Sequence, residues 1–323
     1  MRLVGADGRI DADRLSLGFP VYTAAAASWV VVLREQSDEH KRAAASWLNV
    51  VRDHQLDEDL GWWPGEASYG GWSYAIVPPR RPEAGHGGAT INDSNISATL
   101  FAIGALRAAG ATRGDPALRR AAVFVQRCQN FADHPDTADA PFDDGGFFFS
   151  PTDPTRNKPG SAGADRSGRI RYHSYGSATA DGLRALIRCG LPLDHRRVRA
   201  AHRWLANHFS AGTNPGRFEP DREVLRDSYY HYYCWSVAHA FMAVGVRRVR
   251  TADGEADWPA QLARELIARQ RRDGSWTNRF TDAKEDDPLV STPLAAAALS
   301  ICRMMITGES RALASPANRS TGP

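Results

Sequence analysis

The sequence has few cysteines, no long apolar run and almost no excess of charge of either sign. Its four cysteines form no C-x-x-C pair, which argues against a disulfide framework. No apolar run reaches membrane-spanning length, and the apolar segment 19–33 lacks the basic flank and cleavage site of a signal peptide. With 40 Lys+Arg against 37 Asp+Glu, the net charge of +3 provides no basic stripe for nucleic acid. We therefore expect no transmembrane segment and no nucleic-acid partner, and the sequence carries no signal for a compartment.

Two classes of segment alternate along the 323 residues. One class is amphipathic and basic, and its arginine pairs, such as Arg119-Arg120 and Arg196-Arg197, indicate solvated helix faces. The other class is apolar nearly all the way round and rich in Ala, Gly and Ser, whereas signals for strands are weak. The basic segments are 41–48, 120–125, 199–205 and 261–270, and the apolar segments are 22–33, 96–109, 176–189, 229–246 and 292–305.

This alternation predicts an all-α fold with buried inner helices and half-exposed outer helices. Helices that are apolar on all sides must be buried on all sides, and their small residues favour a closed double ring over an open solenoid. We expect one α/α-toroid domain over residues 1–308, with five inner and four outer helices, followed by a disordered tail over residues 309–323. The chain begins in the middle of the pattern, near residues 3–8, which predicts an incomplete toroid at the N-terminus.

Each basic segment runs into a glycine-aromatic loop, and these loops carry a family resemblance. Gln270 with Gly274-Ser275-Trp276, and Gln129 with Gly145-Gly146-Phe147, resemble the Gln-Trp repeats of squalene-hopene and oxidosqualene cyclases. The other two loops are Gly61-Trp62 and Gly216-Arg217-Phe218. Segments 93–106 and 175–186 look like inner helices of the same repeats. The resemblance, which extends to protein prenyltransferase β subunits, implies the α/α-toroid fold and a hydrophobic, isoprenoid-like ligand in the ring cavity.

The catalytic motifs of those families are absent from this sequence. The Asp-x-Asp-Asp acid of the cyclases has no match, and the nearest segments are 92–95 and 285–288. Segment 227–234 resembles the one that carries the zinc-binding His of the prenyltransferases, but no Asp-x-Cys partner occurs near residues 171–175. We therefore predict no metal and no cofactor, and the sequence leaves open whether the protein is an enzyme.

Candidate site residues lie mostly near the starts of the apolar segments. Asp93 and Asp181 are the candidate catalytic acids, although Asp93 could instead be a helix N-cap and Asp181 could pair with Arg184. In a toroid the inner-helix N-termini share one end of the ring, so polar and aromatic groups there would converge. The candidate ligand-binding residues are Trp62, Trp72, His173, Tyr175, His231, Tyr232 and Trp235.

Two other functions remain open beside the binding of an apolar small molecule. A repeat scaffold could present the long Asp-, Pro- and Gly-rich loop 131–171 to a protein partner. A carbohydrate-active α/α barrel could use paired carboxylates, namely Asp143 or Asp144 with Asp93.

Overall fold

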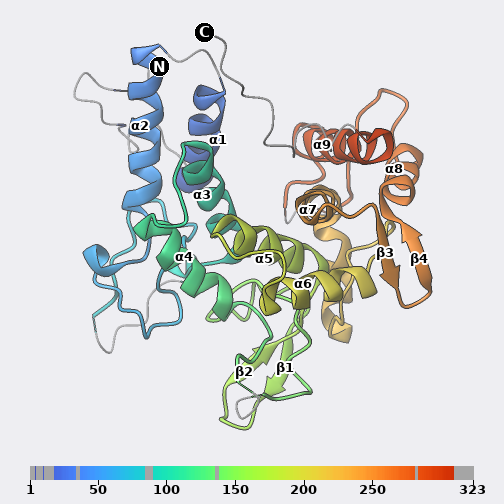
Figure 1. Cartoon of the computed structure of the whole chain (residues 1–323), viewed down its shortest axis with the longest axis horizontal. Helices are drawn as coiled ribbons and strands as arrows, with labels where there is room; N and C mark the ends of the chain where they lie inside the picture. Colours follow the sequence, from blue (N-terminus) through green and yellow to red (C-terminus); the bar gives the residue numbers. More distant parts are fainter. Residues whose placement is uncertain are drawn as a thin grey trace.

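The protein is mostly helical. A computed structural model describes residues 18–33, 37–83, 90–134, 138–280 and 283–308, together with Val4 and Ile10. The predicted tail at 309–323, and residues 3–8 apart from Val4, lie outside the described residues. The α-helices of this described part are α1 Pro20–Val32, α2 Asp38–Asp53, α3 Ile96–Ala108, α4 Pro116–Arg127, α5 Gly176–Arg188, α6 Arg196–Asn207, α7 Tyr230–Val244, α8 Trp258–Ala268 and α9 Pro288–Thr307 (Figure 1).

The remaining regular structure is short. Two antiparallel hairpins pair β1 Ser161–Ala164 with β2 Ile170–Tyr172, and β3 Arg248–Thr251 with β4 Gly254–Asp257. The 3-10 helices are η1 Glu58–Leu60, η2 Thr90–Asn92 and η4 Pro220–Tyr229. These hairpins are the strands that the weak period-two signal did not predict.

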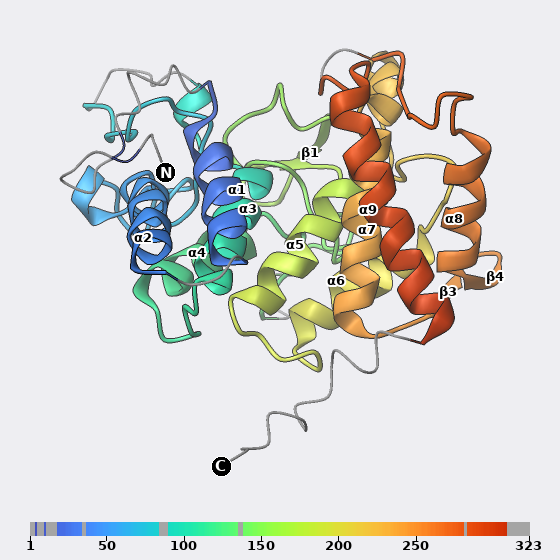
Figure 2. The same ribbon diagram turned by 90° about the horizontal axis from the view of Figure 1, so that it is seen from above.

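The α-helices form two rows. Helices α1, α3, α5, α7 and α9 pack in succession, each against the next, and Figure 1 shows them as an arc from α1 to α9. Helices α2, α4, α6 and α8 lie on the outer side of this arc. Figure 2 shows α1 and α9 on opposite sides of the molecule with α5 between them. The alternation of apolar and basic helices is thus confirmed, with each predicted segment inside or overlapping one helix.

Burial supports this division in the middle of the row but not at its two ends. Helix α1 buries five of its 13 residues, and a third (33%) of the apolar stretch of α9 is buried, so the prediction that every apolar helix is buried on all sides is wrong for these two. In α5 every residue from Gly176 to Leu186 is buried, and in α3 nearly every residue is, because both helices have neighbours on several sides. Helices α2, α4 and α6 bury one face only, and polar side chains cover the other face. One main hydrophobic core runs through the described helices, from Val21 in α1 to Met305 in α9.

Glutamine side chains tie successive repeats together. Gln129 Nε2 donates to the carbonyl oxygens of Gly145 (3.0 Å) and Arg197 (2.9 Å). Gln55 Nε2 makes the same pair of bonds to Gly70 and Ala117, each at 2.9 Å. Each glutamine thus joins a glycine loop to the first turn of the next outer helix.

This equivalence corrects the position of the first glycine-aromatic loop. The backbone N–H of Trp72 donates to Thr99 Oγ1, as that of Phe147 does to Thr179 Oγ1, both at 3.0 Å. The loop that corresponds to Gly145-Gly146-Phe147 is therefore Gly70-Gly71-Trp72. The prediction of Gly61-Trp62 for this role is wrong, because Gln55 bonds to Gly70.

Arg197 and Arg120, the second members of two arginine pairs, are not simply solvated, which corrects the prediction for these two residues. The Arg197 side chain is 7% exposed and pairs with Asp133 at 2.6 Å, and its Nη1 donates to Gln129 Oε1 at 3.0 Å. Arg120 makes the corresponding ion pair with Asp57 at 2.7 Å. Arg120 and Arg197 therefore belong to the contacts between successive repeats.

Helix α9 bears on the expectation of no transmembrane segment. Its 20 residues, Pro288–Thr307, are long and apolar enough to cross a membrane. A third (33%) of its apolar 18-residue stretch is buried within the protein. Length and composition alone are weak evidence, because core helices of soluble proteins meet the same criterion.

Candidate functional site

A chain of hydroxyl groups connects four helices of the inner row. Tyr22 OH on α1 donates to Ser97 Oγ on α3 at 2.8 Å, and Ser97 Oγ lies 2.9 Å from Tyr232 OH on α7. Tyr232 OH donates to Asp181 Oδ2 on α5 at 2.7 Å. Because both Ser97 and Tyr232 lie in the first turns of their helices, the chain runs near the N-terminal ends of the row.

Asp181 is the acidic end of this chain, and it is 2% exposed. Ser236 also donates to it, and Arg184 Nη1 lies 3.7 Å from Oδ1. Burial raises the pKa of Asp181 to about 6, against the opposing effects of Arg184, Ser236 and Tyr232. A carboxyl group of this kind exchanges its proton close to neutral pH.

Aromatic rings surround the hydroxyl chain. The rings of Phe101 and Trp235 stack with centroids 5.7 Å apart, and Tyr22 packs on Phe101 at 4.8 Å. Tyr232 lies 5.4 Å from Trp235. All four side chains are only partly buried, although they come from the inner row of helices. They form an aromatic surface with a polar chain beneath it, which we call the aromatic face (Tyr22, Phe101, Tyr232 and Trp235).

Arg184 places positive charge against the aromatic face, and Arg188, one turn further along α5, lies against Trp29, which is not a member of that face. The guanidinium of Arg184 lies 4.3 Å from the ring centroid of Trp235, and that of Arg188 lies 5.9 Å from that of Trp29. Burial and the nearby Arg184 lower the pKa of Arg188 to about 9. Arg188 makes no ion pair with any described residue. Against the effect of burial, the negative charge of Asp181 raises the pKa of both Arg184 and Arg188, which lie one turn apart on α5.

Of the candidate site residues, Asp181, Tyr232 and Trp235 meet at this aromatic face, whereas Asp93 does not. Asp93 is half-buried before α3, and burial raises its pKa against hydrogen bonds from Thr152 and Ser68. Asn95, not Asp93, caps α3, since Asn95 Oδ1 accepts from the backbone N–H of Ala98 at 2.9 Å.

The two candidate tryptophans of the first loop lie in packed surroundings. Trp72 is fully buried, and its Nε1 donates to the carbonyl of Val51 at 2.6 Å. Trp62 is 7% exposed and packs in a small separate cluster with Leu56 and Tyr69. Both rings bond to backbone carbonyls, Trp62 to that of Pro79 at 2.7 Å, so each stabilises its loop.

His173, Tyr175 and His231 also have protein partners. His173 Nε2 lies 3.1 Å from Glu219 Oε1, and Tyr175 is buried at the N-cap of α5 with its ring against Phe218. His231 Nδ1 lies 3.0 Å from Glu285 Oε2, and His231 lines a cavity that is separate from the aromatic face.

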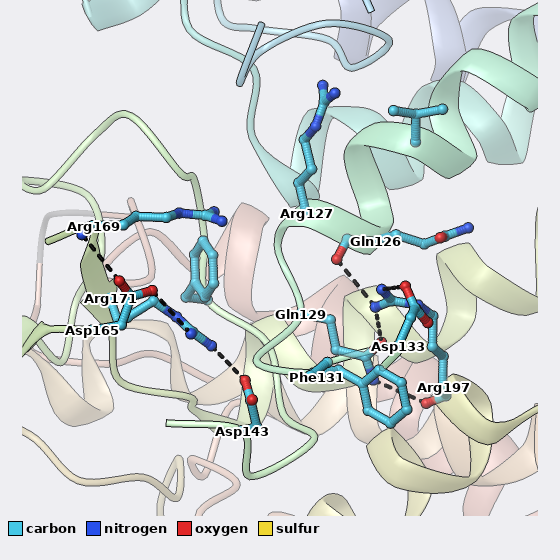
Figure 3. A pocket seen from close by; sticks show the side chains of 13 residues that line it. Gln126, Arg127, Gln129, Phe131, Asp133, Asp143, Asp165, Arg169, Arg171 and Arg197 are labelled. Atoms are coloured by element: carbon cyan, nitrogen blue, oxygen red, sulfur yellow. Dashed lines mark hydrogen bonds and ion pairs between the residues drawn. The ribbon is translucent and has the colours of Figure 1, made fainter. Parts of the chain in front are cut away.

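A larger cavity of about 470 Å³ lies between the end of α4, the β1–β2 hairpin and α6 (Figure 3). Figure 3 shows Arg171 between Asp165 and Asp143, at 3.4 and 2.7 Å. Arg197, on the other side of the cavity, is paired with Asp133. Most of the charged groups here neutralise one another.

The same pairing bears on the carbohydrate-active hypothesis. Asp143 is bound to Arg171, and Asp144 accepts hydrogen bonds from Ser174 (2.7 Å) and Trp204 Nε1 (3.0 Å). Both carboxylates are thus engaged in holding the loop, so neither is a free partner for Asp93. Within the described ranges, no three His, Cys, Asp or Glu side chains gather where they could hold a metal ion.

Sequence reasoning missed two members of the aromatic face, Tyr22 and Phe101, and one member of the hydroxyl chain, Ser97. Each lies in an apolar segment and resembles an ordinary core residue. Their contacts join residues 75 and 135 positions apart, as in the bonds of Ser97 to Tyr22 and Tyr232. The one available signal was the position of Tyr22 and Ser97 near the starts of predicted inner helices.

Comparison with known proteins gives a likeness of fold. A crystal structure of a protein from Actinoplanes aligns with 97% of this chain and 76% of its own, with a TM-score of 0.50 and 17% sequence identity. At that identity the likeness shows a shared fold alone. No family model matches the chain, and no curated protein matches it.

Proposed function

We propose that the protein binds an amphipathic, isoprenoid-like molecule against the aromatic face, in an arrangement of helices related to the α/α-toroid. The resemblance of the Gln-Trp repeats to those of terpenoid cyclases supports the toroid, as do the two rows of helices. In this proposal α1, α3, α5, α7 and α9 are the inner helices.

The observation that carries the proposal is the partial exposure of stacked aromatic rings from three different inner helices around buried polar groups. Tyr22, Phe101 and Trp235 offer an apolar wall, and the hydroxyl chain ends beneath it at Asp181. Binding pockets combine such walls with a few fixed polar groups that orient the ligand. The apolar part of the ligand lies on the rings.

The polar end of the ligand is assigned by charge. Arg188 lacks a carboxylate partner among the described residues, and its lowered pKa reports an unfavourable burial of its charge. An anionic headgroup would supply the missing counter-charge. We therefore expect prenyl diphosphates to bind more tightly than the corresponding alcohols.

The proposal concerns binding rather than polyene cyclisation. Protonation of an isolated double bond needs a very strong acid, whereas burial makes Asp181 a weaker acid than an ordinary aspartate. Asp181 is suited instead to hold a hydrogen bond or to exchange a proton with a polar group.

Mass spectrometry of small molecules extracted from the natively folded protein is the first test. A co-purifying isoprenoid is the expected result, and saturable binding of farnesyl diphosphate would follow by calorimetry. Trp235→Ala removes the central ring and should weaken binding at least tenfold, which corresponds to about 1.4 kcal/mol. Trp63→Ala is the matched control, because Trp63 is 59% exposed in a loop and belongs to no part of the aromatic face.

Two results would overturn the proposal. One is an empty extract together with no saturable binding of squalene, farnesol or farnesyl diphosphate, which would direct attention to protein partners. The other is equal loss of affinity in Trp235→Ala and Trp63→Ala. Arg188→Gln should weaken the diphosphate but not farnesol, and equal effects on both would remove the headgroup assignment.

A further inference from the structure

A second cavity, of about 450 Å³, lies beside the start of α7. It is bordered by η4, by the end of α8 and by the segment 277–280. His231, Tyr230 and Asn278 line it together with Arg279 and Phe280. None of these residues belongs to the aromatic face, so the following inference is independent of the proposed function.

Glu285 fixes the ring of His231. The Glu285 side chain is 1% exposed, and its oxygens accept from the backbone N–H groups of His231 (2.9 Å) and Tyr232 (2.8 Å) and from Asn278 Nδ2 (3.2 Å). His231 Nδ1 lies 3.0 Å from the same carboxylate. Because a carboxylate only accepts hydrogen bonds, Nδ1 is the nitrogen that carries the proton. Nε2 of the neutral ring is then left as an acceptor.

That acceptor has no partner among the described residues. The His231 side chain is 3% exposed, and its Nε2 is buried without a hydrogen bond. Buried polar groups are nearly always bonded, and an unpaired one is costly to keep. A ligand in the adjacent cavity that brings an O–H group would satisfy it.

The charges and rings of the cavity define the rest of the ligand. Arg226 pairs with Glu223, and Arg269 pairs with Glu265, so both are neutralised. Arg279 lies over the ring of Phe280 at 4.9 Å and makes no ion pair within the described part of the chain. Phe280 and Tyr230 add apolar surface. Asp227 also lines the cavity, where it accepts from Thr213 Oγ1 (2.7 Å) and the backbone N–H of Asn214 (3.1 Å) and makes no ion pair within the described residues. Beside the buried Nε2 acceptor, the cavity therefore offers one available cation, one further carboxylate and an apolar wall.

We propose that this cavity binds a small hydroxy acid. The hydroxyl of the ligand donates to His231 Nε2, its carboxylate pairs with Arg279, and its carbon skeleton lies against Phe280 and Tyr230. A site with a buried acceptor discriminates strongly against a ligand that lacks the hydroxyl, because the acceptor then stays unpaired.

The test is a titration of the full chain, with labelled histidine rings observed by NMR. The probes are lactate, glycerate and 3-phenyllactate, and the matched probes without the hydroxyl are propionate and 3-phenylpropionate. The His231 signals are assigned by their loss in His231→Gln. We expect a saturable shift of these signals with at least one hydroxy acid, and at least tenfold weaker binding of its deoxy partner.

Arg279→Ala provides a second variant in case His231→Gln fails to fold. It should weaken binding at least fivefold, whereas Arg272→Ala, which removes an exposed arginine outside the cavity, should leave binding unchanged. The proposal fails if none of the three hydroxy acids shifts His231 saturably. It also fails if the deoxy partners bind equally well, or if Arg272→Ala weakens binding as much as Arg279→Ala.

Discussion

Two opposing effects set the properties of the Asp181 carboxyl group. Burial disfavours the charged form, whereas Arg184 at 3.7 Å and the hydroxyls of Ser236 and Tyr232 favour it. Burial is the larger effect, because the pKa of Asp181 is raised to about 6 from 3.8. The folded protein therefore binds this proton more tightly than the unfolded chain does.

This raised pKa predicts a pH dependence of stability. The contribution of Asp181 to the free energy of unfolding should fall as pH rises from about 4 to about 6, because the native state holds the proton over this window. Asp181→Asn mimics the neutral acid and should abolish that dependence. At pH 7 the variant should be more stable than wild type by up to about 3 kcal/mol, because it keeps a neutral group where wild type buries a charge, and each unit of raised pKa corresponds to about 1.4 kcal/mol. Urea unfolding at pH 4, 5, 6 and 7 measures both effects.

Asp221→Asn is the control for this prediction, because Asp221 is exposed and should show no effect. A loss of several kcal/mol in Asp181→Asn at pH 7 would contradict the prediction. It would mean that attraction to Arg184 outweighs the cost of burial, and that Asp181 acts as a structural ion pair.

At the residue scale the sequence predicted part of the candidate site. Asp181 was identifiable because an unpaired acid within an apolar helix is costly, so it must have a partner or a function. Tyr232 and Trp235 were identifiable because aromatic residues cluster at the start of segment 229–246. Tyr22 and Phe101 were not, because only the packing of α1 and α3 beside α5 and α7 brings them there. The buried Arg197 was also missed, since an arginine on an amphipathic helix usually faces water.

At the scale of the elements, the buried hydrogen bonds of Gln129 are expected to contribute more to stability than those of an exposed glutamine. Gln129→Ala leaves the carbonyls of Gly145 and Arg197 without their donor in a buried site. We expect a loss of about 2–4 kcal/mol in the free energy of unfolding, as for other unpaired buried groups. Gln270→Ala is the matched control, because its amide bond to Gly274 is exposed, and it should cost less than about 1 kcal/mol. Equal losses in urea unfolding would show that burial of the tie is unimportant.

The loop between η1 and α3 depends on the close approach of Gly70 to helix α4. Gly70 and Gly110 both have positive φ, +86° and +91°, so alanine is strained at either position. A Cβ at Gly70 would overlap the backbone of Arg120, whereas one at Gly110 meets open space. Gly70→Ala should therefore cost at least about 2 kcal/mol more than Gly110→Ala in urea unfolding. Equal costs would mean that the backbone conformation alone accounts for the loss.

Helices were more predictable from the sequence than loops. Segments 96–109 and 176–189 located α3 and α5 almost to the residue, because a helix that is buried on most sides consists mainly of small and apolar residues. The first loop was misplaced because the sequence has a glycine shortly before a tryptophan at both Gly61 and Gly70. Both glycines also have positive φ, so their local backbone does not separate them. Only the long-range bond from Gln55 to Gly70 distinguishes the two.

At the scale of the whole molecule, the number of neighbours that each helix packs against determines which parts open first. Helix α5 packs against α3, α4, α6 and α7, whereas α9 packs against α7 and α8 among the described elements. In repeat proteins stability is approximately a sum of contacts between neighbours, so segments with fewer neighbours open at lower cost. The hydrophobic core is continuous, but its resistance to opening should not be uniform.

The buried cysteines report this difference. Cys189 follows α5 and Cys302 lies in α9, and burial raises the pKa of each thiol to about 12, so neither reacts while it stays buried. In urea below the unfolding midpoint, N-ethylmaleimide should modify Cys302 at least about tenfold faster than Cys189, because opening α9 breaks contacts with fewer helices. Peptide mass spectrometry over time measures both rates. Equal rates at every urea concentration would instead show that α9 and α5 open together, as parts of one cooperative unit.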